Sequence, residues 1–380
     1  MKSVGLITEY NPFHNGHLYH AQQSKINSQA DVSVAIMSGN FVMRGEPAIF
    51  NKFIRTQMAL SVVDLVVELP TIASLSSGDF FGKMAIKVAN YIDINTISFG
   101  SEHGNIVELQ NAVNHVLELE NNPIFKSKIK EGKSYPRIIS ELIKDQQTLN
   151  ILQSPNNILS IGYLKAIQQY APHIEAMTIY RESAQHRDNT IKHQQFASGS
   201  SIRQSLINQE TDWYKVVPQN IKSLYQNQMT TVEDTFPYIK HQLLTQDTNT
   251  LNTIYTVSEG FENRLKTIIK DVNSFKELLS KTKTKRYTYT HIQRILMNIL
   301  LNIHQHDITN DIRAIRILGM NEQGRAYLKY LKQQYPERRF ITNINKSSAT
   351  YFPIEIKATN VYNLLSQQSQ NDFNTPVIQT

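Results

Sequence analysis

Ser-Val-Gly-Leu-Ile-Thr-Glu-Tyr-Asn-Pro-Phe-His-Asn-Gly-His, residues 3–17, is the stretch that decides the fold. Its apolar beginning, residues 3–7, predicts a short buried strand, and the polar, turn-rich residues 8–12 end that strand. A helix is expected to begin near Asn15 and Gly16. A strand that passes through a polar turn into a helix is the opening unit of an α/β fold.

The same alternation of strand and helix continues over the next hundred residues. Apolar runs without polar alternation recur, separated by segments of helical character. Such spacing favours βαβ units and a parallel sheet that is covered on both faces. Further strands are expected at residues 31–37, 64–70, 96–99 and 177–180, and helices at residues 50–63 and 80–91.

The rest of the sequence divides by its periodicity. Residues 108–172 and 200–305 are mainly helical in pattern, whereas the C-terminal part mixes a helix with short strand-like pieces. We expect a parallel-sheet domain at 1–204, a helical, basic region at 205–310 and a small α/β part at 311–380. In this last part we expect a helix at 324–334, strands at 340–342 and 354–357, and a frayed polar tail from residue 366.

Composition excludes several classes of site. The 380 residues include no cysteine, which excludes a disulfide framework, a thiolate metal site and a cysteine nucleophile, and fits a reducing compartment. No apolar run approaches the roughly 20 residues that span a bilayer, and no signal peptide is visible at the start of the sequence. We therefore expect a cytoplasmic protein with no membrane partner.

The net charge of +7 is unevenly distributed. Residues 1–120 carry 7 Lys and Arg against 11 Asp and Glu, a net charge of −4, so the remaining residues carry a net charge of +11. A polyanion such as nucleic acid would therefore meet the later part of the chain. A solvated basic surface explains the same distribution.

The side chains that most indicate chemistry are His14 and His17, which flank Gly16 directly after the first strand. Ligands of an open parallel sheet bind at the carboxyl ends of its strands, where a helix N-terminus offers N–H groups to an anion. Gly16 would let the backbone approach a phosphate. Two imidazoles three residues apart share one side of the helix and can donate hydrogen bonds to a triphosphate. Two alternatives remain: a metal site completed by His20, and histidines that are only satisfied polar neighbours of the core.

Several blocks of sequence resemble the bacterial tRNA(Met) cytidine acetate ligase family, and the first block is specific enough to name it. The resemblance implies a Rossmann-like nucleotidyltransferase fold of the HUP type and an enzyme that acts in two steps. Acetate and ATP would give acetyl-adenylate, whose acetyl group would pass to the wobble cytidine of elongator tRNA(Met) as N4-acetylcytidine. The blocks are residues 5–17, 37–48, 64–70, 99–102, 154–159 and 198–203, with lesser likeness at 317–320 and Gly324.

The resemblance also implies which residues bind ATP. The segment 7–20 would wrap the nucleotide, with His14 and His17 on the phosphates. Ser200 and Ser201 would offer hydroxyls to phosphate, or would belong to a plain helix N-cap. Asn157 would complete the pocket, or would only hold a turn. The other implied ATP contacts are Ile7, Thr8, Glu9, Tyr10, Asn11, Pro12, Phe13, Asn15, Gly16, His20, Gly100 and Arg181.

One segment departs from the family pattern. After Arg181 the family has a small glycine-containing stretch that leads to Tyr-His-Asp, whereas residues 182–188 read Glu-Ser-Ala-Gln-His-Arg-Asp. Asp188 is present, but Arg187 stands in the place of the histidine. No role of that histidine can therefore be carried over to this chain.

Contacts with tRNA are predicted from charge. Residues 281–289 interleave cations with tyrosines, which could neutralise phosphates and stack on unpaired bases. A solvated entrance to a helix is the alternative. Arg44, Lys52 and Arg55 are candidate contacts for phosphate or tRNA, or ordinary surface cations. The predicted RNA contacts are Lys281, Lys283, Lys285, Arg286, Tyr287 and Tyr289.

The implied reaction needs little proton transfer. Acetate is a carboxylate at neutral pH, so its attack on phosphorus needs no general base. Catalysis should be electrostatic and positional, with Mg²⁺ carried by the triphosphate and no metal held by the protein alone. The expected partners are acetate and elongator tRNA(Met), and no protein partner is predicted. Two other functions stay open: a small-molecule adenylyltransferase or acyl-adenylate ligase without tRNA, and a catalytically silent RNA-binding protein.

Overall fold

A mixed sheet with mostly parallel strands forms the centre of the molecule. The computed structural model describes residues 1–131, 135–181, 191 and 195–380. Within them, eight strands form one sheet in the order β10-β8-β5-β2-β1-β6-β7, with β9 paired to β8. The order β5-β2-β1-β6-β7 is that of a doubly wound nucleotide-binding sheet. These five parallel strands are β1 (Ser3–Thr8), β2 (Val32–Ser38), β5 (Leu65–Leu69), β6 (Thr96–Ser101) and β7 (Glu175–Tyr180).

These strands lie where their apolar runs predicted them. Every residue of β2 is buried, and β1 pairs with it in one unbroken register from Ser3↔Val32 to Thr8↔Met37. Runs of apolar residues suit such strands because crossover helices cover both faces of a parallel sheet. The predicted α/β fold, with a Rossmann-like parallel sheet, is therefore confirmed.

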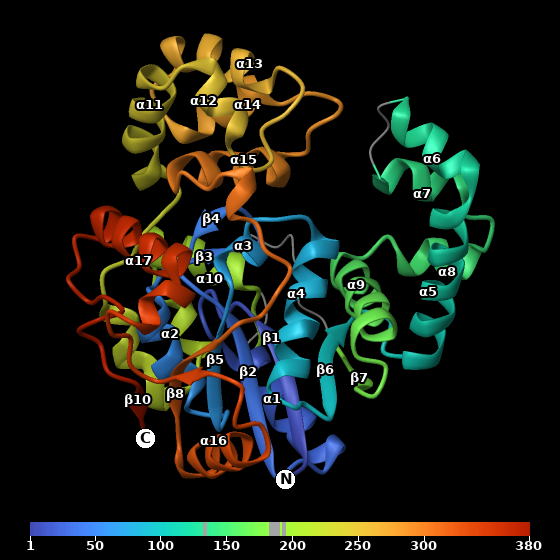
Figure 1. Ribbon diagram of the computed structural model, residues 1–380, viewed down its shortest axis with the longest axis vertical. Coiled ribbons are helices and arrows are strands. Elements are labelled where there is room, and N and C mark those ends of the chain that lie inside the picture. Colours follow the sequence, from blue (N-terminus) through green and yellow to red (C-terminus); the bar gives the residue numbers. More distant parts are fainter. Residues whose placement is uncertain (132–134, 182–190, 192–194) are drawn as a thin grey trace.

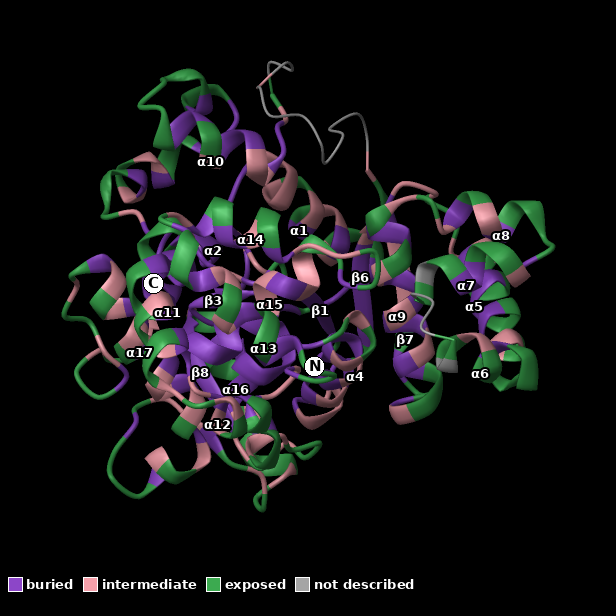
Figure 2. Cartoon of the chain, turned by 90° about the horizontal axis from the view of Figure 1, so that it is seen from above, coloured by how far each residue is buried: buried purple, intermediate pink, exposed green. Residues whose placement is uncertain are grey.

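Helices cover both faces of the sheet (Figure 1). One layer buries side chains such as Val34 and Leu65, and the other buries Leu6 and Ala35. Figure 2 shows the buried strands between the layers. The first layer includes α4 (Gly78–Tyr91), α9 (Pro155–Tyr170) and α16 (Glu322–Gln334), and the second includes α1 (Asn15–Ser28), α2 (Lys52–Ala59) and α10 (Gly199–Ile207).

A helical arm follows β6, and in Figure 1 α6 and α7 project away from the sheet. Asn105, Asn122 and Asp145 begin three of its helices, and each side chain accepts hydrogen bonds from backbone N–H groups of the first turn. The arm thus divides into short helices where the sequence supplies N-cap residues. Its helices are α5 (Ile106–Asn121), α6 (Pro123–Lys130), α7 (Tyr135–Leu142) and α8 (Gln146–Ile151).

A second hydrophobic core belongs to the helical region, which lies above the sheet in Figure 1. This core also takes in Phe41, from the hairpin of β3 (Phe41–Val42) and β4 (Glu46–Pro47), and Ile72 from α3 (Thr71–Ser74). The helical region therefore shares apolar contacts with the sheet domain. Its helices are α11 (Phe236–Thr245), α12 (Thr248–Thr253), α13 (Phe261–Ile268), α14 (Phe275–Thr282) and α15 (Tyr289–Leu300).

The C-terminal residues agree with the sequence predictions for the helix at 324–334 and the strand at 340–342, and differ from them elsewhere. A strand that was not predicted, β8 (Ile315–Met320), pairs antiparallel with β5 and extends the main sheet. Both β9 (Phe340–Ile341) and β10 (Ile378–Gln379) then pair with β8. The strand predicted at 354–357 is wrong, because these residues lie in the first turns of α17 (Pro353–Ser366). The frayed tail is also wrong, since Asp372 is buried and β10 joins the sheet.

Candidate active site

The predicted site lies where the strand order of the sheet reverses. From β1 the chain continues to β2 on one side, whereas β6, the neighbour of β1 on the other side, leads to β7. Ligands of open α/β sheets bind in the crevice outside the carboxyl ends of the strands at this switch point. Thr8 ends β1, Ser101 ends β6, and Arg181 directly follows β7. The structure thus brings three separate predicted segments to one end of the sheet.

His14 and His17 form a stacked pair at the first turn of α1. Their ring centroids are 3.7 Å apart and their planes differ by 24°. His14 is the N-cap residue, and its Nδ1 accepts a hydrogen bond of 3.1 Å from the Gly16 backbone N–H. The neutral His14 ring therefore carries its proton on Nε2, which becomes a hydrogen-bond donor.

Two aromatic side chains of the preceding loop hold His17. The centroids of the Tyr10 and Phe13 rings lie 4.9 Å and 5.7 Å from that of His17. Tyr10 and Phe13 are buried, so both rings belong to the core behind the histidines. These two predicted ATP contacts position the imidazoles through packing.

Gly16 has a steric role that the sequence did not suggest. A Cβ atom at Gly16 would lie 2.9 Å from Cε1 and 3.0 Å from Nδ1 of His14. His14 is only 4% exposed, which limits how far its ring can move away. The missing side chain of Gly16 thus makes room for the His14 imidazole.

Side chains from three distant elements hold the loop between β1 and α1. Each donates a hydrogen bond to a loop carbonyl, and the three carbonyls alternate along the chain. Fixing every second carbonyl restricts the path by which the loop enters α1. The bonds run from Arg55 Nη1 to Glu9 O (2.6 Å), from Arg203 Nη1 to Asn11 O (2.6 Å) and from Tyr225 Oη to Phe13 O.

Sequence reasoning missed these three clamps. Arg203 belongs to the block 198–203, but nothing in that block indicates that its partner is the backbone carbonyl of Asn11. Tyr225 reaches Phe13 over 212 positions of sequence, and no local pattern signals that pairing. Arg55 was predicted to contact phosphate or tRNA or to be a surface cation, and its burial follows only from the assembled sheet.

The first turn of α10 lies against the same loop. A Cβ atom at Gly199 would come within 3.0 Å of Asn11 O. Ser201 N donates to Ser198 Oγ at 3.1 Å, and the buried Ser201 hydroxyl donates to Ser198 O at 2.9 Å. These bonds are those of the plain N-cap alternative. Ser200 is only partly buried, and its hydroxyl lies 3.5 Å from a guanidinium nitrogen of Arg44.

The far side of the site combines Gly100, Arg181 and His20. A Cβ atom at Gly100 would lie 2.9 Å from Cδ of Arg181, whose Nη1 donates to Asn156 Oδ1 at 3.1 Å. His20 Nε2 lies 3.5 Å from Ser98 Oγ. Burial, with the nearby charge of Arg181, lowers the pKa of His20 to about 4, so this ring is neutral at pH 7.

Asn157 holds the turn after β6. Its Oδ1 accepts hydrogen bonds from the backbone N–H groups of Glu102 (3.0 Å) and His103 (3.3 Å), and its Nδ2 donates to Ile151 O at 3.0 Å. Both ends of this buried amide are thus engaged, as in the turn-holding alternative. The segment 182–188, which follows Arg181 in the sequence and includes Arg187 and Asp188, lies outside the described residues.

The remaining predicted residues of the first segment support the loop. Glu9 Oε1 accepts from the Met43 backbone N–H at 2.7 Å, and burial raises the pKa of this carboxyl. Asn11 Oδ1 accepts from Ile49 N at 2.8 Å. Asn15 Nδ2 donates to Gln195 O at 3.0 Å, which joins α1 to the chain before α10. The other predicted residues that precede the histidines in this segment are Ile7, which is half-buried, and Thr8 and Pro12, which are buried.

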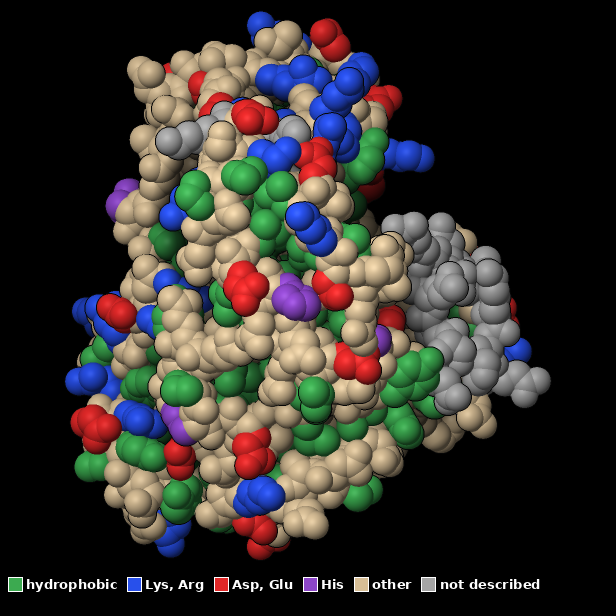
Figure 3. Space-filling model, turned by 90° about the vertical axis from the view of Figure 1, so that its right-hand side faces the viewer, with side chains coloured by type: hydrophobic (Ala, Val, Ile, Leu, Met, Phe, Trp, Pro, Cys, Tyr) green, Lys and Arg blue, Asp and Glu red, His purple; other side chains and the backbone are tan. Residues whose placement is uncertain are grey.

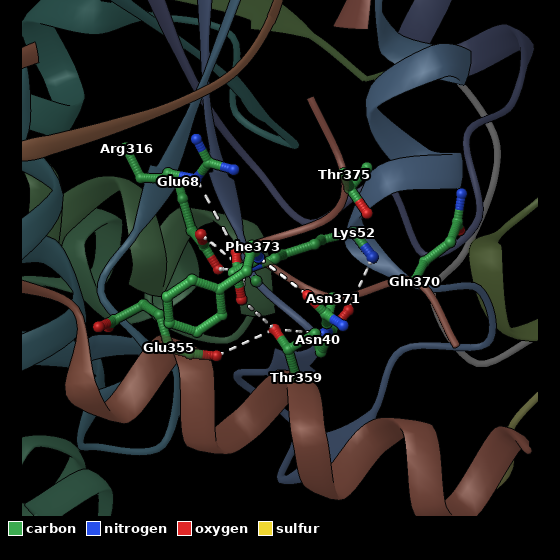
Figure 4. Close-up of polar contacts among 12 residues, drawn as sticks. Asn40, Lys52, Glu68, Arg316, Glu355, Thr359, Gln370, Asn371, Phe373 and Thr375 are labelled. Carbon is green, nitrogen blue, oxygen red and sulfur yellow. Dashed lines mark hydrogen bonds and ion pairs between the residues drawn. The ribbon is translucent and has the colours of Figure 1, made fainter. Parts of the chain in front are cut away.

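Lys52 and Arg55 are not surface cations. Lys52 Nζ lies 2.9 Å from Glu68 Oε1 and 2.8 Å from Asp372 Oδ1, within the cluster of Figure 4. Both cations are fully buried, so their predicted contacts with phosphate or tRNA are wrong. Their charges are tolerated because carboxylates pair with Lys52 and carbonyls accept from Arg55.

The C-terminal tail completes this buried ionic cluster (Figure 4). Asp372 accepts a hydrogen bond of 2.7 Å from the Thr359 hydroxyl of α17 and lies 3.8 Å from Arg316 Nε of β8. Burial raises the pKa of Glu68 to about 7, an effect that the nearby Lys52 charge opposes. The tail is held in place because its Asp372 carboxylate pairs with the buried cations Lys52 and Arg316.

The predicted RNA segment, residues 281–289, precedes and begins α15. Tyr287 is buried and packs on Phe261 with centroids 4.5 Å apart, so its prediction as a base-stacking surface is wrong. Tyr289 is 51% exposed, and Lys283 Nζ lies 5.6 Å from its ring centroid. The exposed Arg286 forms an ion pair with Glu259. The other predicted contacts, Lys281 and Lys285, are exposed, and Lys281 Nζ donates to Asp271 O at 2.9 Å.

Figure 3 shows Lys and Arg side chains gathered on the upper part of one face, at the level of the helical region and the arm.

In the described part of the chain, no group of three or more His, Asp or Glu side chains could hold a metal ion, so the metal alternative for His14, His17 and His20 finds no support there. Over the same residues, none of the helices has the length and apolar character to cross a membrane.

The sequence and fold are similar to those of known proteins. The family model of the HIGH nucleotidyl transferases matches residues 1–375. A tRNA(Met) cytidine acetate ligase of Staphylococcus aureus (strain MRSA252) is 58% identical over 379 residues, which cover 100% of this chain and 99% of the relative.

Two crystal structures of Thermotoga maritima TmcAL are similar to the whole chain at 25% identity. The apo form has a TM-score of 0.90 over 100% of this chain and 99% of its own. The form bound with alpha-thio ATP has a TM-score of 0.88 and covers 100% of both chains. Because its sequence and fold match over the whole length, this chain belongs to the tRNA(Met) cytidine acetate ligase family of HIGH nucleotidyltransferases.

Proposed function

We propose that this chain is an ATP-dependent acetate ligase that forms acetyl-adenylate and transfers its acetyl group to the wobble cytidine of elongator tRNA(Met), giving N4-acetylcytidine. The observation that carries the proposal is the stacked pair of His14 and His17 at the switch point of the sheet. The chain's 58% identity to a tRNA(Met) cytidine acetate ligase supports the choice of substrates.

In the first step, a carboxylate oxygen of acetate attacks the α-phosphorus of ATP. The bond from that phosphorus to the bridging oxygen breaks, and pyrophosphate leaves. Both reactants are anions, so the protein must stabilise negative charge and hold the reactants in line, and no proton has to be removed. The Nε2–H of His14, the His17 ring and the N–H groups at the start of α1 supply that stabilisation.

ATP fits the described site in chemistry. The loop 8–13 and the first turns of α1 and α10 border one end of the sheet, and Arg181 borders it beyond β6. Mg²⁺ supplies charge neutralisation when it enters with the triphosphate. Glu9, the carboxylate of this loop, already accepts a hydrogen bond from Met43, which agrees with a metal carried by the nucleotide.

In the second step, N4 of the cytidine attacks the acetyl carbon of acetyl-adenylate. A C–N bond forms, the C–O bond to AMP breaks, and N4 loses one proton. We assign tRNA binding to the helical region 205–310, whose exposed cations include Lys285 and Arg286. An anticodon-loop base is exposed or readily unstacked, so presenting its amine costs little. We place this reaction in the cytoplasm, where tRNA is found.

Incubation of the purified chain with labelled acetate, ATP and total tRNA tests the proposal. Label should appear as N4-acetylcytidine in elongator tRNA(Met), and acetate-dependent exchange of pyrophosphate into ATP should occur. Label in a small molecule without RNA would instead identify a small-molecule ligase. Absence of both exchange and transfer would refute an adenylating function.

A further inference from the structure

One cation beside the proposed site remains without an assigned role. Of the three candidates Arg44, Lys52 and Arg55, the last two are buried in structural contacts. Arg44 is exposed and occupies the tip of the hairpin formed by β3 and β4. Its role therefore depends on where the hairpin tip places its guanidinium.

The hairpin tip is held from two sides. Met43 N donates to Glu9 Oε1 at 2.7 Å, on the loop after β1, and Met43 O accepts from Arg294 Nη1 of α15 at 3.2 Å. Gly45 has a φ of +75°, and a Cβ atom there would overlap the backbone nitrogen of Arg294. The backbone that carries Arg44 is thus fixed between the loop that joins β1 to α1 and the helical region.

The Arg44 side chain reaches the first turn of α10. Its Nη1 lies 3.5 Å from Ser200 Oγ, and Nη2 of Arg203 lies 3.5 Å from the same oxygen. The two guanidinium nitrogens are therefore no more than twice that distance apart. Two like charges so close repel each other unless negative charge lies between or beside them.

The two arginines differ in how their charge is balanced. Arg203 donates to Asn11 O and lies 3.3 Å from Glu46 Oε1. In the described part of the chain, no carboxylate lies within ion-pair distance of Arg44, and its hydrogen bond to Ser200 is long. Its charge also lowers the pKa of Glu9, against the larger effect of burial, which places the two groups near each other. Arg44 is thus a positive charge beside the loop of His14, with its strong donors available to a ligand.

We propose that Arg44 contacts the polyphosphate of the bound nucleotide and stabilises the charge of the departing pyrophosphate. This inference rests on the proposed adenylating function and adds a catalytic residue to it. A guanidinium suits the task because its planar donors pair with two phosphate oxygens at once, which an ammonium group cannot do.

The test compares Arg44→Gln and Arg44→Lys with the wild-type chain in acetate-dependent exchange of pyrophosphate into ATP, without RNA. Arg325→Gln is a matched control, because Arg325 is also exposed and makes a side-chain hydrogen bond, to Gln379, outside the site. We expect Arg44→Gln to lower kcat/KM for ATP by about tenfold to a hundredfold. The kcat/KM of Arg44→Lys should lie between the values for Arg44→Gln and the wild type, and that of Arg325→Gln should equal the wild-type value.

The dependence on pyrophosphate makes the test specific. Loss of a polyphosphate contact should raise the KM for pyrophosphate in the exchange reaction, while the apparent affinity for acetate stays unchanged. Equal exchange by wild type and Arg44→Gln would overturn the inference. Unchanged exchange with impaired acetyl transfer to tRNA would also overturn it, and would make Arg44 an RNA contact. If the wild-type chain shows no exchange, the proposed function itself fails, which is a separate result.

Discussion

Substituting Gly16 by alanine tests the central geometry of the site. The added Cβ would lie 2.9 Å from His14 Cε1 and 3.0 Å from its Nδ1, inside normal van der Waals contact. His14 cannot simply swing away, because it is 4% exposed and stacked on His17 at 3.7 Å. The substitution must therefore displace the imidazole or break the hydrogen bond between Gly16 N and His14 Nδ1.

The expected effects on stability and activity differ in size. Loss of the N-cap hydrogen bond costs about 1 kcal/mol. Alanine in place of glycine in a helix returns up to about 1 kcal/mol, so the free energy of unfolding should change little. A catalytic group misplaced by about 1 Å can lower the rate about a hundredfold. We therefore expect exchange activity to fall by at least about tenfold while stability stays within about 1 kcal/mol of wild type.

The assay combines urea unfolding with acetate-dependent pyrophosphate exchange. Gly78→Ala is the matched control, because Gly78 also lies in the first turn of a helix and a Cβ atom there meets no atom within 4 Å. This control should keep full exchange activity. Wild-type exchange by Gly16→Ala would refute the argument that Gly16 exists to accommodate the His14 ring.

Three further predictions concern the groups around the site. The pKa of His20 falls from 6.5 to about 4 on folding, so between these pH values the unfolded chain binds more protons and stability is lost as pH falls. His20→Gln should therefore flatten this part of a plot of unfolding free energy against pH. An unchanged slope would contradict the lowered pKa of His20. Tyr225→Phe leaves the buried Phe13 carbonyl without its donor and should cost about 1–3 kcal/mol in urea unfolding, whereas Tyr214→Phe, at a residue 40% exposed, should cost little. Lys52→Met leaves the buried carboxylates of Glu68 and Asp372 without their cation and should lower the free energy of unfolding by about 3–5 kcal/mol. Lys332→Met, at an exposed lysine, is the control. A small effect would contradict the prediction and would mean that the two carboxylates take up protons at little cost.

The parallel sheet and the position of the histidines after its first strand were predictable because they depend on local patterns. Apolar runs such as 31–37 and 64–70 are long enough to specify buried strands, and a His-x-Gly-His motif directly after a strand places the site. Residues 354–357 misled because four residues alternate as in a strand, while Pro353 in fact begins a helix there. A segment of four residues is too short to distinguish the two-residue repeat of a strand from the 3.6-residue repeat of a helix.

Burial of charge was the part that local sequence could not predict. Lys52 is a buried cation because Glu68 and Asp372 both pair with it, and Asp372 lies 320 positions away in the sequence. Tyr287 lies in a run of cations and still packs on Phe261, because the core of the helical region forms from segments that no window of sequence contains together. The clamp of Tyr225 on Phe13 has the same origin.

The Met43 peptide has a mechanical consequence. Its N–H is bound to the nucleotide loop through Glu9, and its neighbouring carbonyl is bound to α15 through Arg294. The N–H and C=O of Met43 belong to two adjacent planar peptide units, so a shift of α15 must either rotate the backbone at the Met43 Cα or break one of the two bonds. Docking of a large substrate on the helical region would then affect the loop between β1 and α1, and faster solvent exchange of the Met43 amide proton would report a weakened bond to Glu9.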